Sequence, residues 1–218
     1  VAALEYDLAK EINGQAVATE IARHELYGCT GAEMVQEMKP YHIDFPNVKN
    51  NCLRFEVSPS IEESATFTDA DWAELGNDFM QRMGLANHQY IIIRHSGTES
   101  KKEQAHLHIL ANRVSLSGEL YRDNWIGKKA TEAANAIAKE RNFVQSQDIG
   151  KVNKAEIKEA MDGVLKKMQG FDFTKFKEEL GKRGFKVREA RASTGKLNGY
   201  YVTARSGTEY KASEIGKG

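Results

Sequence analysis

The fold of this chain is decided by two segments, His88-Gln-Tyr-Ile-Ile-Ile-Arg-His95 and His106-Leu-His-Ile-Leu-Ala-Asn-Arg-Val114. The apolar run in residues 88–94 is typical of a strand buried on both faces, and residues 105–114 alternate as a second strand. Residues i and i+2 of a strand share a face, so His106 and His108 project together. If the strands pair antiparallel, His95 returns close to His106.

Three neutral imidazoles at one point suit a divalent transition metal and leave positions open for substrate oxygens. Such an ion activates water or polarises a phosphate for attack by a side chain. The same pattern is also compatible with ordinary polar residues on a sheet face. Among eight tyrosines, Tyr6 stands beside Glu5 and Asp7, while Tyr200 and Tyr201 lie in a basic segment. The residues alone do not choose a nucleophile.

Local patterns place the remaining elements. We expect helices at the start of the chain and near 30–39, 68–83, 126–141, 153–168 and 173–183, strands at 52–57 and 119–122, and a hairpin of 185–192 with 197–204. Helices and strands mix without regular βαβ alternation. This favours an α+β fold with a central, mainly antiparallel sheet flanked by helices and a small C-terminal helix-plus-hairpin region.

Composition bounds the class of protein. The 218 residues are 40% hydrophobic and 28% charged, with three prolines and two cysteines, which is ordinary globular composition without a disulfide framework. The longest apolar run, residues 90–93, is far below the ~20 residues that cross a bilayer. No basic-then-apolar leader opens the chain. We therefore expect a cytoplasmic protein without a membrane partner.

The zero net charge conceals two opposite halves. Residues 1–110 carry 9 Lys and Arg against 17 Asp and Glu, whereas residues 111–218 carry 22 against 14, and residues 182–218 carry 9 against 3. Clustered cations indicate a polyanion partner for the second half. Lysine-rich helices with solvated faces would give the same count, so charge leaves both interpretations open.

The two histidine segments, ending in Asn112-Arg-Val114, resemble the third motif of plasmid mobilization relaxases, in the HUH endonuclease superfamily. Leu4-Glu-Tyr6 resembles the tyrosine motif of that family, and Phe55-Glu-Val-Ser-Pro59 resembles its second motif. Lys211-Ala-Ser-Glu-Ile-Gly-Lys217 resembles a piece that recurs in longer members. The resemblance spans most of the chain in the family's order.

The resemblance implies an enzyme that nicks one DNA strand at a transfer origin for conjugative mobilization. Tyr6 would attack the phosphodiester and form a 5′-phosphotyrosyl link, with a divalent metal, Mn or Mg, held by His95, His106 and His108. The substrate would be single-stranded or hairpin DNA, with accessory mobilization proteins, in the bacterial cytoplasm. Residues expected to contact DNA are Arg94, Asn112, Arg113, Lys182, Arg183, Lys186, Arg188, Arg191 and Lys196. Residues 1–150 would form the catalytic core and 151–218 a basic extension contacting DNA.

Three departures from the family pattern stand out. Gly97 occupies the place of a usual acidic residue, whose role we expect Glu99 or Glu103 to take, and Arg54 stands where many members have histidine. Relatives also carry a strand before the tyrosine motif, and we expect this strand to be missing here. We also expect the chain to come from a larger parent protein with a further C-terminal region.

Two other functions remain open. One is a DNA-binding module that holds an origin without nicking it, and the other is a replication-initiating nuclease of the same superfamily. A histidine-triad nucleotide hydrolase is excluded, because position 110, where a third alternating histidine would stand, is Leu110.

Overall fold

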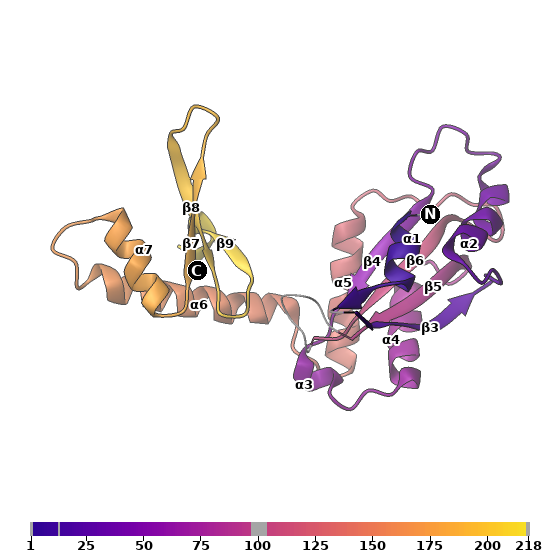
Figure 1. Ribbon diagram of the computed structural model, residues 1–218, viewed down its shortest axis with the longest axis horizontal. Coiled ribbons are helices and arrows are strands. Elements are labelled where there is room, and N and C mark those ends of the chain that lie inside the picture. Colours follow the sequence, from indigo (N-terminus) through magenta and orange to yellow (C-terminus); the bar gives the residue numbers. More distant parts are fainter. Residues whose placement is uncertain (1, 13, 97–103, 217–218) are drawn as a thin grey trace. The chain divides into compact units, whose positions relative to one another are not determined.

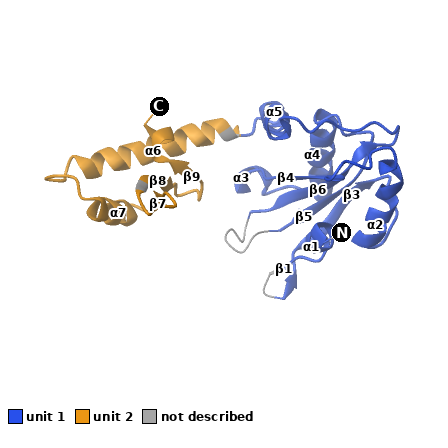
Figure 2. Cartoon of the chain, turned by 90° about the horizontal axis from the view of Figure 1, so that it is seen from above, with its two compact units in different colours: residues 1–143 blue, residues 144–218 orange. Residues whose placement is uncertain are grey.

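The computed structural model describes residues 2–12, 14–96 and 104–216. The chain divides into two compact units, residues 1–143 and residues 144–218 (Figure 2). The boundary expected after residue 150 falls inside helix α6 (Ser146–Leu165). The assignment of the units as catalytic core and DNA-contacting extension stays a prediction.

A four-stranded antiparallel sheet forms the centre of the first unit (Figure 1). Its strands are β3 (Ala18–His24), β5 (His88–His95), β6 (His106–Ser115) and β4 (Cys52–Val57), in that order across the sheet. The two histidine segments supply the central pair, and almost every residue of both is buried. The α+β class with a mainly antiparallel sheet is thereby confirmed.

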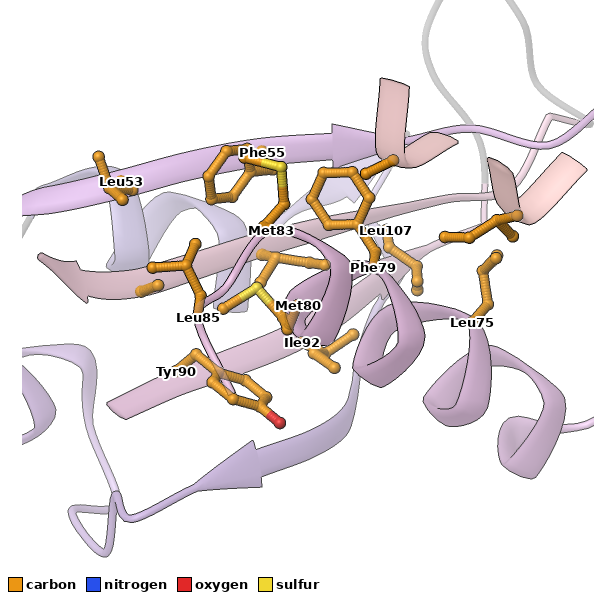
Figure 3. Close-up of a cluster of buried hydrophobic side chains, with 14 of the residues drawn as sticks. Leu53, Phe55, Leu75, Phe79, Met80, Met83, Leu85, Tyr90, Ile92 and Leu107 are labelled. Carbon is orange, nitrogen blue, oxygen red and sulfur yellow. The ribbon is translucent and has the colours of Figure 1, made fainter. Parts of the chain in front are cut away.

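Two helices, α4 (Asp69–Arg82) and α5 (Ile126–Glu140), contribute to the core on one face of the sheet (Figure 3). Thr68 begins α4 through a capping box with Asp71, as the sequence predicts. Gly76 lets this helix approach closely, because a Cβ there would stand 2.7 Å from Cδ1 of Ile92.

The opposite face of the sheet carries a second core. Helices α1 (Ala2–Leu8) and α2 (Gly31–Met38), followed by the short helix η1 (Lys39–His42), pack there. Its buried side chains are Leu4, Leu26, Met34, Met38, Ile91, Ile93 and Leu110. Because strand side chains alternate, His95 shares this face with Ile93, and His108 shares it with Leu110. The histidines therefore lie on the side of the sheet that α1 covers.

Small elements complete the first unit: the hairpin β1 (Glu11–Ile12) with β2 (Gln15–Ala16), and helix α3 (Ile61–Ser64). The strand predicted at 119–122 is wrong. Only an isolated bridge between Val114 and Leu120 forms there.

The second unit has its own hydrophobic core. Helices α6 and α7 (Phe173–Lys182) precede a three-stranded antiparallel sheet of β7 (Lys186–Arg191), β8 (Leu197–Thr203) and β9 (Glu209–Lys211), and α8 (Ala212–Ile215) ends it. The predicted hairpin is β7 with β8. Within the described residues, none of the helices combines the length and the apolarity that a bilayer crossing requires.

Candidate active site

Three histidines converge where β5 ends and β6 begins. His95 is the antiparallel partner of His106, and His108 follows on the same face of β6. The ring centroid of His108 lies 4.4 Å from that of His95 and 4.9 Å from that of His106. One ring nitrogen from each residue lies within 4.8 Å of the other two, and all three residues are buried.

The hydrogen bonds of these rings fit a metal centre. Nε2 of His95 lies 2.7 Å from the carbonyl oxygen of Asp7, to which it can donate, and its Nδ1 is buried with no partner among the described residues. Nε2 of His106 and Nε2 of His108 lie 3.1 Å apart. Nitrogens that bind one ion at about 2.1 Å are roughly 3.0–3.4 Å apart. An orphaned ring nitrogen beside two at ligand spacing is a donor set for a divalent ion.

The electrostatics at His95 and His108 favour neutral rings. Burial lowers the pKa of His108 to about 4, with smaller lowering from the charges of His95, Arg54 and His106 against an opposing effect of Asp7. Burial also lowers the pKa of His95. Imidazoles that are neutral at pH 7 offer lone pairs to a metal without first losing a proton.

Arg54 and Asp7 form an ion pair against this cluster. Nε and Nη2 of Arg54, on β4, donate to the two carboxylate oxygens of Asp7 at 2.9 and 2.8 Å. Nη2 also lies 3.0 Å from Nδ1 of His108. The Asp7 side chain is 1% exposed, whereas that of Arg54 is 44% exposed. Arg54 therefore links the first helix to the histidines.

Helix α1 presents Tyr6 through the anchoring of its neighbours. Leu4 is completely buried in the core, Glu5 accepts a hydrogen bond from the N–H of Ala32 at the start of α2, and Asp7 pairs with Arg54. Tyr6 is the residue in this stretch that stays exposed, at 59%. Nζ of Lys10 lies 5.4 Å from the centre of its ring. Contacts on either side of Tyr6 thus fix its backbone at the cluster's edge.

Close approach of α1 to α2 depends on Gly31. A Cβ at this position would stand 3.1 Å from Cδ of Glu5 and 3.1 Å from Cγ of Leu4. These two distances are shorter than most Cβ contacts in proteins, so the glycine at position 31 allows α1, which carries Tyr6, to pack closely against α2.

The DNA-contact candidates of the first unit have protein partners. Asn112 has no exposed surface, and its side chain bonds to His42, Gln89 and the carbonyl of Met38. A side chain enclosed in this way holds η1 on the sheet and offers DNA no surface, which corrects the expected role. Arg94 pairs with Asp69, and Arg113 pairs with Asp123.

Six candidates of the second unit divide into two groups. Those with partners in the protein are Lys182 with Glu179, Arg188 with Glu209, Arg191 with Glu189, and Arg183 with the carbonyl of Ala160. Lys186 and Lys196 are exposed, and no ion pair to either is found among the described residues. Among these six candidates, Lys186 and Lys196 therefore offer the most available positive charge for a polyanion.

Gly97, Glu99 and Glu103 lie outside the described residues. The contacts that sequence reasoning missed are those of Asp7 and Arg54. Their positions in the motifs were visible, but only the packing of α1 on the sheet brings residues 47 positions apart into one ion pair.

The comparisons agree with the geometry. A family model described as "Relaxase: MobA/VirD2-like, nuclease domain" matches residues 6–143, which extends from Tyr6 to the end of the first unit. No curated protein matches the chain, and no solved structure does. The match confirms the resemblance to mobilization relaxases of the HUH type. Because it covers more than half of the sequence, the chain belongs to the MobA/VirD2-like relaxase family, through its nuclease domain.

Proposed function

We propose that this protein nicks one strand of DNA at a transfer origin by attack of Tyr6 on a phosphodiester, as the first step of conjugative mobilization. A bond forms between Oη of Tyr6 and phosphorus, and the bond between phosphorus and O3′ breaks. The phenol loses one proton and the 3′-oxygen gains one. The products are a 5′-phosphotyrosyl link and a 3′-hydroxyl, so the strand can be rejoined by the reverse reaction.

One observation carries this proposal. An exposed tyrosine precedes, by one residue, the carbonyl that accepts a hydrogen bond from the histidine cluster at 2.7 Å. An exposed phenol on the residue next to that carbonyl can reach a phosphate, whereas a tyrosine that served packing would be buried.

His95, His106 and His108 would hold the divalent ion, Mn²⁺ or Mg²⁺. When bound, the ion offsets the negative charge of the phosphodiester, which otherwise repels an anionic nucleophile. The protein's own part is to keep His95 and His108 neutral by burial and to fix the orientation of His95 through the carbonyl of Asp7.

The second unit would bind the DNA near the nick. Residues 144–218 carry 16 Lys and Arg against 10 Asp and Glu, whereas residues 1–143 carry 15 against 21. Attraction for single-stranded or hairpin DNA therefore belongs mainly to the second unit, with Lys186 and Lys196 as its exposed contacts. Accessory mobilization proteins and a bacterial cytoplasmic setting are part of the same proposal.

The test is covalent capture. The purified protein is incubated with Mn²⁺ or Mg²⁺ and single-stranded oligonucleotides that tile the DNA flanking its gene. We expect a denaturation-resistant adduct whose cross-linked peptide contains Tyr6 by mass spectrometry. Tyr6→Phe should abolish the adduct, and Tyr27→Phe is the matched control, because Tyr27 is also exposed in the first unit.

Other results would point elsewhere. DNA binding without an adduct, with either ion and with every oligonucleotide, would favour the origin-binding module that does not nick. An adduct on another tyrosine would overturn the assignment of Tyr6. A nick mapped to an origin of replication would identify a replication initiator.

A further inference from the structure

The groups that can touch DNA at this site are not the histidines. The exposed fractions of His95, His106 and His108 are 0%, 3% and 5%. Against this buried cluster, the Arg54 side chain is 44% exposed and Tyr6 is 59% exposed. Asp7, which holds Arg54, directly follows Tyr6 in α1, so the exposed guanidinium is anchored to the residue next to the nucleophile.

The guanidinium of Arg54 is held on one side and free on the other. Arginine has five N–H donors in a rigid fork. Nε and Nη2 donate to Asp7, and Nη2 also reaches Nδ1 of His108. No hydrogen bond from Nη1 is found within the described residues. Two donors thus remain on a group whose orientation is already fixed, so little freedom is lost when they bind an anion.

We propose that Nη1 of Arg54 binds a non-bridging oxygen of the phosphodiester that Tyr6 attacks. This inference rests on the proposed function and adds a residue to it. Arginine binds phosphate oxygens through charge-assisted hydrogen bonds, which are about twice as strong as neutral ones. The contact orients the phosphorus toward Oη of Tyr6 and stabilises the charge that builds on its oxygens during attack. Arg54, which departs from the family pattern, becomes a substrate-binding residue of this chain.

A structural explanation of Arg54 accounts for only part of these contacts. Pairing with a buried Asp7 uses Nε and Nη2, and a lysine or a buried arginine could neutralise that carboxylate as well. The partial exposure of Arg54 and its two unused N–H donors contribute nothing to the ion pair with Asp7. A phosphate group needs both in order to reach the guanidinium and accept hydrogen bonds from it.

The test distinguishes the effect of losing the Arg54 cation from the effect of breaking its ion pair with Asp7. The double variant Arg54→Gln/Asp7→Asn removes the cation and leaves no unpaired buried charge, while Asp7→Asn alone keeps the cation. The matched control is Arg82→Gln/Asp78→Asn, which neutralises a pair on α4. Once the nick site is mapped by the adduct, each protein is assayed at saturating DNA with a phosphate or a methylphosphonate at that position.

We expect the Arg54→Gln/Asp7→Asn protein to form the adduct about 100-fold more slowly than the control on the phosphate. On the methylphosphonate diastereomer that lacks the contacted oxygen, the loss of rate should shrink below about 3-fold. The substrate has then already lost the contact that the substitution would remove, so the two effects do not add. The affinity for Mn²⁺ should not fall, because the substitution removes the Arg54 N–H that competes with the metal for a ring nitrogen of His108. An equal loss on both substrates, no loss, or a parallel fall in Mn²⁺ affinity would overturn the proposal.

Failure of the proposed function would be recognised separately. If the wild-type protein forms no adduct, the contact is tested by the ¹⁵N signal of Arg54 Nε during titration with diethyl phosphate, assigned by its loss in Arg54→Lys. A shift at Arg54 that is absent at Arg82 would support the phosphate contact even though nicking fails. An unchanged signal would reject it.

Discussion

Asp7 accepts two hydrogen bonds from Arg54, at 2.9 and 2.8 Å, across 47 positions of sequence. The backbone carbonyl of the same Asp7 accepts a third from His95. One residue, adjacent to the candidate nucleophile, is thereby tied to both β4 and β5. The position of Tyr6 is a property of the assembled sheet.

Replacing Asp7 with Asn should loosen this tie. The Arg54 guanidinium would lose its anionic partner, and we expect the free energy of unfolding to fall by about 1–3 kcal/mol, less than for a fully buried pair because Arg54 keeps contact with water. Urea unfolding at pH 7 measures the change. Asp78→Asn, in a surface pair on α4, should cost less than about 1 kcal/mol. Equal effects of the two variants would contradict the anchoring role of Asp7.

Stability without metal should fall as the pH drops from 7 to 5. The folded protein holds His108 neutral down to about pH 4, whereas the unfolded chain protonates it near the ordinary value of 6.5. Between these values the unfolded state binds more protons, so stability is full above pH 6.5 and declines toward pH 4. The loss for this residue is about 2 kcal/mol at pH 5. Urea unfolding in chelator at several pH values tests this, and the curve of His108→Gln should be flatter.

His106→Ala should separate metal binding from DNA binding. We expect the Mn²⁺ affinity to fall more than about 100-fold, because even outer partners of metal ligands contribute about 10- to 100-fold. Adduct formation should be lost while affinity for single-stranded DNA stays within about 2-fold. Calorimetry with Mn²⁺ and fluorescence anisotropy with labelled DNA give the two constants, and His24→Gln, on β3, is the control. Full activity of His106→Ala would contradict the metal assignment.

Salt dependence of DNA binding should identify the lysines that contact phosphates. Because each contact with a single strand contributes about 0.7 to the slope of log K against log salt, Lys186→Ala/Lys196→Ala should lower the slope by about 1.4. Lys182→Ala should change it little, since Glu179 already neutralises Lys182. Anisotropy titrations of the full chain across several salt concentrations measure these slopes. Unchanged slopes would favour lysines that are merely solvated.

The sequence predicted the parts of the fold that rest on local pattern. An unbroken apolar run and an alternating segment identified the two central strands, and the capping box at Thr68 located the start of α4. The edge strand β3 was not predicted, because its residues are only partly buried or exposed and show no clean alternation. Its place depends on pairing with β5, which is a property of the tertiary structure.

The site shows the same limit. Strand periodicity and antiparallel pairing are enough to bring His95, His106 and His108 together. The burial of Asn112 and the contact of Arg54 with both Asp7 and His108 depend on which helix covers which face of the sheet. No spacing along the chain encodes that packing.

The pairing of His95 with His106 has a consequence for how this family can diversify. The strand ladder, rather than the chain that joins β5 to β6, sets the distance between these two imidazoles. We therefore expect a change in the length of this connection to leave the ligands in place, provided that Gln104 is kept, because its carbonyl oxygen lies 3.2 Å from Nδ1 of His106. A shift of β6 by one residue, in contrast, would turn His106 and His108 to the opposite face. We expect engineered chimeras to tolerate exchange of this connection and to fail when the register of β6 is altered.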